Sequence, residues 1–220
     1  MTELKYYPNI YNLLLGIEAI SALVGLYYYP KLKHTYWKWF SIYLIFICFH
    51  ELFWKFQTSF SDNARRASFT FLSIPIQHLF FYWLYAYKSL KNKLLFYIFS
   101  FAYIASYIPL SIFFTDTENS FQIILITGNI PLIILLLLEL KKQIKNDDIL
   151  KFRENKMFYI NIAMIIFYVS ISPFYAFYEE LKQDPYKNIW NIYYLYFYVA
   201  NCIMYLLFIT SFICGKHQSP

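Results

Sequence analysis

Apolar residues occur along the chain in seven long runs, separated by short polar or charged stretches. Each run extends over about 20 residues, the length that an α-helix needs to cross the ~30 Å hydrocarbon layer of a bilayer. Backbone groups in hydrocarbon must pair within their own segment, so each run is predicted to be a helix. The predicted spans lie near residues 10–29, 37–56, 68–87, 94–114, 120–140, 157–178 and 190–213.

The composition favours the same interpretation. Hydrophobic residues make up 60% of the 220 positions and charged residues only 15%, whereas soluble domains are about a quarter charged. The polar residues are too few to cover a soluble globule, so the apolar surface requires lipid. We therefore predict an all-α fold in which residues 1–220 form one polytopic membrane bundle of seven transmembrane helices.

Lysine and arginine are distributed unequally between the two sets of connections. One set holds thirteen of the nineteen basic residues: Lys31, Lys33, Lys38, Lys88, Lys91, Lys93, Lys141, Lys142, Lys145, Lys151, Arg153, Lys156 and Lys216. The alternate set holds six: Lys5, Lys55, Arg65, Arg66, Lys182 and Lys187. Because basic residues accumulate on the cytoplasmic side of a membrane, we predict an external N-terminus and a cytoplasmic C-terminus. The net charge of +6 is then mainly a topology signal, and we expect no binding to nucleic acid.

A few polar and ionisable residues lie inside the predicted spans. Such residues are costly in a membrane and usually face the interior of a bundle or a wet cavity. At a rise of 1.5 Å per residue, they lie about 8–16 Å from the outer ends of six spans. The candidate ligand-binding residues among them are Glu18, His50, Gln77, His78, Asn129, Tyr198 and Asn201. We expect these side chains to line one outward-facing polar pocket.

Some of these polar residues have a simpler structural explanation. Glu18 lacks a basic residue within one helical turn, so it needs protonation or a partner from another helix, for which the two candidate histidines are suited. Glu51, by contrast, is interpreted as a structural pair with Lys55 four positions later, whose long side chain can reach the interface. Asn129 and Asn201 are alternatively hydrogen bonds between helices.

Prolines fall inside several of the predicted spans, including the third, the fifth and the sixth. Pro75, Pro131 and Pro173 each remove a backbone donor and free the carbonyl four positions earlier. We expect the third span to bend at Pro75 and the fifth to be weakened at its centre. Irregular backbone at membrane depth is tolerated where it lines protein or a wet cavity, so these positions support an internal site.

Patterns typical of known seven-helix enzymes and receptors are not found. A retinal-type Schiff base needs a lysine in the middle of the last helix, and the span 190–213 contains none. Metal-dependent seven-helix hydrolases need several histidines at helical spacing, but this chain has four, of which His34 and His217 lie outside the spans. Glu18 with the remaining two could ligate zinc in principle. We assign no metal and no other cofactor.

Four segments combine basic connections with aromatic or proline-containing spans. They are KLKHTYWKWF (31–40), YKSLKNK (87–93), TGNIP with LELKK behind it (127–142), and IWNIYYLYFYVANCIMYLLFITSF (189–212). In these features the chain resembles a group of small bacterial seven-helix integral membrane proteins of uncharacterised function. The resemblance extends over nearly the whole chain and includes no catalytic signature. It implies a multi-pass protein of the bacterial inner (plasma) membrane.

Three functions are compatible with these features. The leading hypothesis is a transporter or sensor that binds a small or lipid-like molecule in the pocket, with Glu18 exchanging a proton with His50 or His78. The second is a membrane-embedded lipid-modifying enzyme that uses glutamate and histidine as acid and base. The third is a structural subunit of a membrane complex, which would add a membrane-protein partner to the lipid bilayer. There, polar side chains would only join helices.

Overall fold

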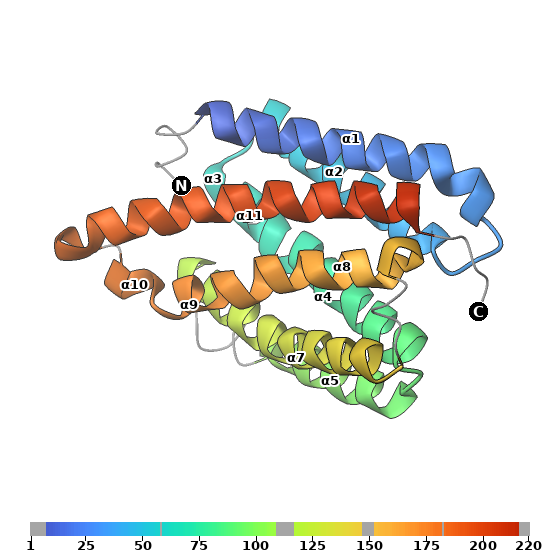
Figure 1. Cartoon of the computed structure of the whole chain (residues 1–220). Helices are drawn as coiled ribbons and strands as arrows, with labels where there is room; N and C mark the ends of the chain where they lie inside the picture. The colour runs from blue at the N-terminus through green and yellow to red at the C-terminus, as the bar shows by residue number, and fades with distance from the viewer. Residues whose placement is uncertain (1–7, 58, 109–116, 147–151, 182, 216–220) are drawn as a thin grey trace.

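The protein is a helical bundle (Figure 1). The computed structural model describes residues 8–57, 59–108, 117–146, 152–181 and 183–215, and no strand occurs among them. Seven helical rods can be followed in this part of the chain. Five are single helices: α1 (Pro8–Leu32), α2 (Lys38–Phe56), α5 (Lys93–Ala105), α7 (Thr117–Lys145) and α11 (Lys187–Cys214). The prediction of an all-α fold is confirmed.

The other two rods are interrupted by wider, π-helical turns. The third rod consists of α3 (Asp62–Ser68), η2 (Phe69–Ser73), α4 (Ile74–Tyr82) and η3 (Trp83–Ser89). The sixth rod consists of α8 (Lys156–Met164), η5 (Ile165–Val169) and α9 (Ser170–Ala176). Two short helices, α10 (Tyr178–Leu181) and η6 (Asp184–Tyr186), connect the sixth rod to α11.

Several helices have the length and the apolar character that crossing a membrane requires. Within the described residues there are five: Asn9–Leu32, Lys38–Phe56, Ile123–Lys145, Lys156–Phe174 and Asp184–Cys214. The predicted spans in the third rod and in α5 are not among them. Described α5 has only 13 residues, and residues 109–114 of the predicted span 94–114 lie outside the described part. Membrane-span-like helices are thus present, while the number of seven spans stays a prediction.

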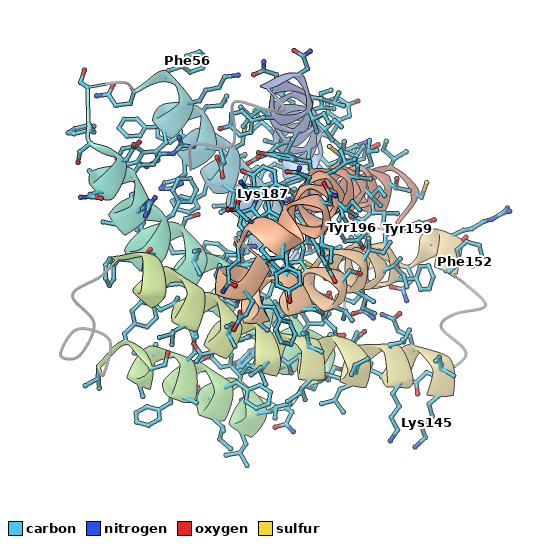
Figure 2. All side chains as sticks on the ribbon, turned by 90° about the vertical axis from the view of Figure 1, so that its left-hand side faces the viewer. Phe56, Lys145, Phe152, Tyr159, Lys187 and Tyr196 are labelled. Carbon is cyan, nitrogen blue, oxygen red and sulfur yellow. The ribbon has the colours of Figure 1, made fainter. Side chains whose placement is uncertain are left out.

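The outer surface of the bundle is apolar. On α1, the side chains of Leu13, Ile20, Leu23 and Tyr27 are all more than half exposed. They recur at helical spacing and therefore form one stripe. Soluble monomers rarely expose contiguous apolar patches of this kind. Lipid contact gives the stripe a favourable environment, and Figure 2 shows side chains projecting outward around the bundle, Phe56 among them.

The rods are arranged around a central space, with α5 outside. Helix α1 packs against α2 and α11, and α11 packs against α8. Helix α7 joins the third rod to the sixth rod. Figure 1 shows α1, α11 and the sixth rod lying alongside one another, and α7 with α5 at the opposite edge. On α5 only Tyr103 is buried, because its main neighbours are the third rod and α7 alone.

The chain alternates between two ends of this bundle, which we name by a residue at each. The Arg65 end is where α1 begins, α2 ends and α3 begins; the Lys142 end is where α7 and α11 end. Helices α1 and α11 both run from the Arg65 end toward the Lys142 end (Figure 1). This arrangement places the basic connections identified in the sequence at the Lys142 end, as far as they lie in the described residues.

The prolines affect their rods in different ways. The π segment η2 ends two residues before Pro75, and η5 ends four residues before Pro173. A wider turn accommodates the clash between the proline ring and the preceding turn. Pro131 lies inside α7, which continues through it from Thr117 to Lys145. The expected weak point at the centre of the fifth span is therefore not a break in the helix.

A buried polar cluster closes the Lys142 end. The Ser89 hydroxyl donates to Glu139 at 2.7 Å, and the Lys142 ammonium donates to the Ser89 carbonyl at 2.9 Å. The Gln143 amide donates to the other Glu139 oxygen at 3.0 Å. Burial and the nearby Glu139 carboxylate raise the pKa of Tyr36, in the connection between α1 and α2, to about 12. The cluster ties the third rod to α7, so this half of the bundle is more polar inside than its sequence indicates.

Candidate functional site

A cavity of about 330 Å³ lies inside the bundle and opens among six of the seven rods. This volume is within the range of small-molecule sites, about 300–1,000 Å³. Its polar lining consists of Tyr11, Glu18, Glu51, Arg65, Arg66, Ser73, Gln77, His78, Asn129, Tyr168, Tyr194, Tyr198, Asn201 and Tyr205. Among the seven rods of described residues, α5 alone contributes none to the lining, and its sequence was also the predicted span without a candidate polar residue.

The structure brings six of the seven candidate residues to this cavity. They are Glu18 from α1, Gln77 and His78 from α4, Asn129 from α7, and Tyr198 and Asn201 from α11. Polar groups at a common depth meet here because the opposite faces of their helices are apolar and occupied by exposed hydrophobic side chains. The sequence thus located these side chains, while their role in binding a ligand stays a proposal.

His50 is the candidate that does not line the cavity. Its Nε2 atom lies 2.8 Å from the Ser68 hydroxyl and 3.2 Å from the indole nitrogen of Trp54, which donates to it. The ring is also edge-on to Phe69, with centroids 4.6 Å apart. His50 therefore joins α2 to α3 in a small hydrogen-bonded group beside the cavity wall.

His78 is held at both ring nitrogens. Nδ1 lies 2.9 Å from the Ile74 carbonyl, which can only accept, so Nδ1 carries a hydrogen. Nε2 lies 3.0 Å from Oδ1 of Asn129. With its hydrogen on Nδ1, a neutral ring can only accept at Nε2, so the amide donates to it when its oxygen and nitrogen are exchanged. Next to Asn129, the Gly128 carbonyl accepts a 2.6 Å hydrogen bond from Tyr82. These contacts lock α4 against α7.

Gly128 is required by this close approach. A Cβ atom at Gly128 would lie 2.6 and 2.7 Å from two atoms of the His78 ring and 2.9 Å from Tyr103. Real Cβ atoms essentially never approach that closely, so only glycine lets the two helices meet here. Gln77, the neighbour of His78, donates to the Tyr168 hydroxyl on the sixth rod. The polar groups in the deep part of the cavity wall therefore form most of their hydrogen bonds with other residues of the protein.

Glu18 differs from these residues because its carboxyl group is buried while one of its oxygen atoms has no hydrogen-bond partner among the described residues. Only 3% of the side chain is exposed, and Oε1 has no hydrogen-bond partner among the described residues. Tyr205 of α11 interacts with the carboxyl group. Neither His50 nor His78 is hydrogen-bonded to it: Nε2 of His50 and both ring nitrogens of His78 have the partners given above. The expected direct exchange of a proton between Glu18 and a histidine is therefore not supported by a contact.

Glu51 also belongs to the cavity, which corrects the interpretation of this residue as the partner of Lys55. The Lys55 ammonium donates to the Asn12 side chain of α1 at 2.6 Å and lies over the Tyr11 ring. Among the ion pairs of the described residues, none joins Glu51 to Lys55. Glu51 instead lines the cavity and interacts electrostatically with Arg65. Helical spacing allowed the pair, but α1 offers the lysine a closer acceptor.

Arg65 and Arg66 are lining residues that the sequence analysis treated as part of a connection. The Ser61 hydroxyl accepts from the Ala64 amide at 3.3 Å and begins α3 at Asp62, about two turns before the predicted span. The extended helix carries both arginines onto the cavity face. A signal for this was present: the face of Ser73 and Gln77 continues backward at helical spacing through Phe69 to Arg65.

Metal ligands are not assembled at the site. No group of three or more histidine, cysteine, aspartate or glutamate side chains with metal-binding geometry occurs among the described residues. Of the three residues considered for a zinc site, Glu18 and His78 line the cavity and His50 lies outside it. The cavity instead presents carboxylates, guanidinium groups, amides and hydroxyls, which bind ligands by hydrogen bonds and charge.

Comparisons with known proteins do not assign this arrangement to a family. No family model, curated protein or solved structure matches the chain. The site is therefore interpreted from the residues of this chain alone.

Proposed function

We propose that this chain is a seven-helix protein of the bacterial inner membrane and that its cavity binds a small or lipid-like molecule for transport or sensing. The apolar outer surface and the five long apolar helices support a membrane location. The excess of basic residues in the connections at the Lys142 end favours a cytoplasmic position for that end. The Arg65 end, with its cavity residues, would then face outward.

The buried carboxyl group of Glu18 is the observation that carries this proposal. An unsatisfied buried polar atom costs about 1–3 kcal/mol, and more when it is charged. An occupant that donates a hydrogen bond to Oε1 removes that cost. Glu18 faces a cavity with room for such a molecule, whereas a group buried only for packing would be enclosed by protein.

The backbone around the cavity supports a site that changes shape. Two of the π segments contribute lining residues: Phe69 and Ser73 from η2, and Phe167 and Tyr168 from η5. Such turns are uncommon and often occur at functional sites. Because their hydrogen bonds are more easily rearranged than those of a regular helix, they favour a cavity that opens to admit its ligand.

The other two hypotheses have less support. A lipid-modifying enzyme with histidine as acid or base would need a free ring nitrogen in the cavity, yet both nitrogens of His78 are engaged and His50 is outside. A purely structural subunit does not require a cavity. We therefore retain binding of a ligand as the function that the site supports best.

Filling the cavity tests this proposal. Asn201→Phe places a ring in the cavity, while Val199→Phe places the same ring on the exposed face of α11, where Val199 is 45% exposed. Native mass spectrometry of protein purified in nanodiscs should detect a non-covalent occupant in the wild type. We expect Val199→Phe to retain it and Asn201→Phe to lose it. The proposal fails if no occupant is found, or if both variants retain it equally.

A further inference from the structure

The cavity contains formal charges of both signs in equal number. Glu18 and Glu51 provide two carboxyl groups, and Arg65 and Arg66 provide two guanidinium groups. Charges inside a membrane protein are expensive unless they are paired. In this cavity, the ion pairs of the described residues include none between Glu51 and Arg65. Glu51 and Arg65 thus line the same space without cancelling each other by direct contact.

The charges are arranged along the axis of the bundle. Arg65 lies near Tyr11 of α1, and Glu51 interacts electrostatically with both residues and with Glu18. Glu18 follows Tyr11 by seven residues, which corresponds to about 10 Å along α1. Lys55 adds a further positive charge over the Tyr11 ring. The basic groups therefore gather at the Arg65 end beside Glu51, and the carboxyl group of Glu18 lies deeper.

The buried polar atoms that lack a normal hydrogen bond also lie at two levels along the cavity. At the Arg65 end, the Nε atom of Arg65 and the Tyr11 hydroxyl are buried close to each other, and neither makes a hydrogen bond of normal geometry. Each can donate to a ligand. Deeper in the cavity, Oε1 of Glu18 can accept from a ligand. Donors at the Arg65 end and an acceptor deeper in the cavity are thus left without hydrogen bonds of normal geometry.

The walls around these groups are apolar and aromatic. Leu14 and Leu15 of α1 separate Tyr11 from Glu18, and Ile47 lines the facing side of α2. The Tyr198 and Tyr205 rings of α11 also line the cavity. Aromatic faces attract ammonium groups, and an apolar wall suits a short hydrocarbon spacer.

We infer that the occupant is a zwitterion whose ammonium group binds Glu18 and Glu51 and whose carboxylate or phosphate binds Arg65 and Arg66. This inference rests on the proposed function and specifies the chemistry of its ligand. An ammonium compound without an anion would enter past two guanidinium groups. An anion without an ammonium group would face two carboxyl groups. Only a molecule with both charges, separated by a short spacer, satisfies the unpartnered atoms at both levels.

A series of probes with one carbon skeleton tests the inference. The probes are 6-aminohexanoate, which carries both charges, hexanoate, which carries only the anion, and hexylamine, which carries only the cation. Phosphatidylethanolamine and phosphatidylglycerol in nanodiscs extend the comparison to a zwitterionic and an anionic lipid headgroup. Binding is measured by calorimetry for the soluble probes and by native mass spectrometry for the lipids. We expect the zwitterion in at least one arm to bind ten-fold or more tightly than its singly charged counterparts.

Variants connect that preference to the named residues. Glu18→Gln should weaken binding of the zwitterion ten-fold or more, and Arg65→Gln should do the same through the anionic group. Glu51→Gln provides a second test should Glu18→Gln fail to fold. Glu180→Gln and Arg153→Gln change exposed residues outside the cavity and should leave binding unchanged.

The outcomes separate this inference from the proposed function. The inference would be overturned if the singly charged probes bound as tightly as the zwitterions in both arms. It would also be overturned if substitution of Glu18, Glu51 and Arg65 left binding of the zwitterion unchanged. If Asn201→Phe nevertheless displaces a native occupant, the proposed function stands and only its ligand class is wrong. If neither a native occupant nor any probe depends on the cavity, both proposals fail.

Discussion

The ammonium group of Lys55 lies 2.6 Å from the side-chain oxygen of Asn12, so this lysine joins α2 to α1 and leaves Glu51 to the cavity. We predict different consequences for the two residues. Lys55→Ala should lower the free energy of unfolding by no more than about 1 kcal/mol, because the contact is exposed. Glu51→Gln should reduce retention of the cavity occupant. Unfolding in detergent measures the change in stability, and native mass spectrometry measures retention of the occupant. If both variants lost the occupant equally, Glu51 and Lys55 would again be interpreted as an ion pair within α2.

The hydrogen bond between His78 and Asn129 should be energetically coupled across α4 and α7. We expect a double-mutant cycle with His78→Ala and Asn129→Ala to give a coupling of about 0.6–1.7 kcal/mol, which are the average and the largest values measured between membrane helices. Reversible unfolding in mixed micelles gives the four free energies. A parallel cycle of His78→Ala with Thr210→Ala, a residue of α11 bonded within its own helix, should give almost no coupling. Equal couplings in the two cycles would show that the bond contributes nothing specific.

Gly128 and Gly16 make a matched pair of helix glycines. Gly128→Ala forces a methyl group against His78 and Tyr103 and should lower the free energy of unfolding by about 1–3 kcal/mol. Gly16→Ala meets no atom within 4 Å and should instead stabilise α1 by up to about 1 kcal/mol. Thermal unfolding of both variants in the same detergent checks the opposite signs. A stabilised Gly128→Ala variant would contradict the close packing of α4 on α7.

The polar cluster at the Lys142 end should contribute to stability without affecting the cavity. Glu139→Ala leaves Ser89 and Gln143 without their buried acceptor, which should cost about 1–3 kcal/mol. Lys145→Ala removes a side chain that extends away from the bundle (Figure 2) and should have no measurable effect. Both variants should retain the cavity occupant in native mass spectra. Its loss in Glu139→Ala alone would mean that the two ends are coupled.

The proposed orientation can be measured by labelling single cysteines. After replacement of Cys48, Cys202 and Cys214, a cysteine at His34, Asn63 or Lys91 is offered to a membrane-impermeant maleimide in intact bacterial cells. We expect labelling at position 63, and labelling at 34 and 91 only after permeabilisation, because basic connections stay in the cytoplasm.

The same experiment tests whether the third rod crosses the membrane. Position 63 lies in the first turn of the rod and position 91 just beyond its last residue, so equal accessibility of the two would place both its ends on one side. Labelling of position 34 but not 63 in intact cells would reverse the orientation and leave the number of spans to be tested separately.

The sequence by itself determined where the helices lie and which of their faces carry polar groups. The seven apolar runs correspond to seven helical rods, because a chain without enough polar surface for water must satisfy its backbone within each segment. Helical rise and period then give the depth and face of a residue. For this reason Glu18, His78, Asn129 and Asn201, which come from four different rods, could all be placed toward the interior before any contact was known.

Only the tertiary structure decided which of these polar groups meet. His50 has the expected depth, but the packing of α2 on α3 turns it to Ser68 and away from the cavity. Arg65 enters the cavity because Ser61 begins a helix where the sequence indicated a connection. Period and rise leave the rotation of each helix and its distance from its neighbours undefined, and hydrogen bonds depend on both to within a fraction of an ångström. Packing between helices therefore selects the partners that helical spacing only allows.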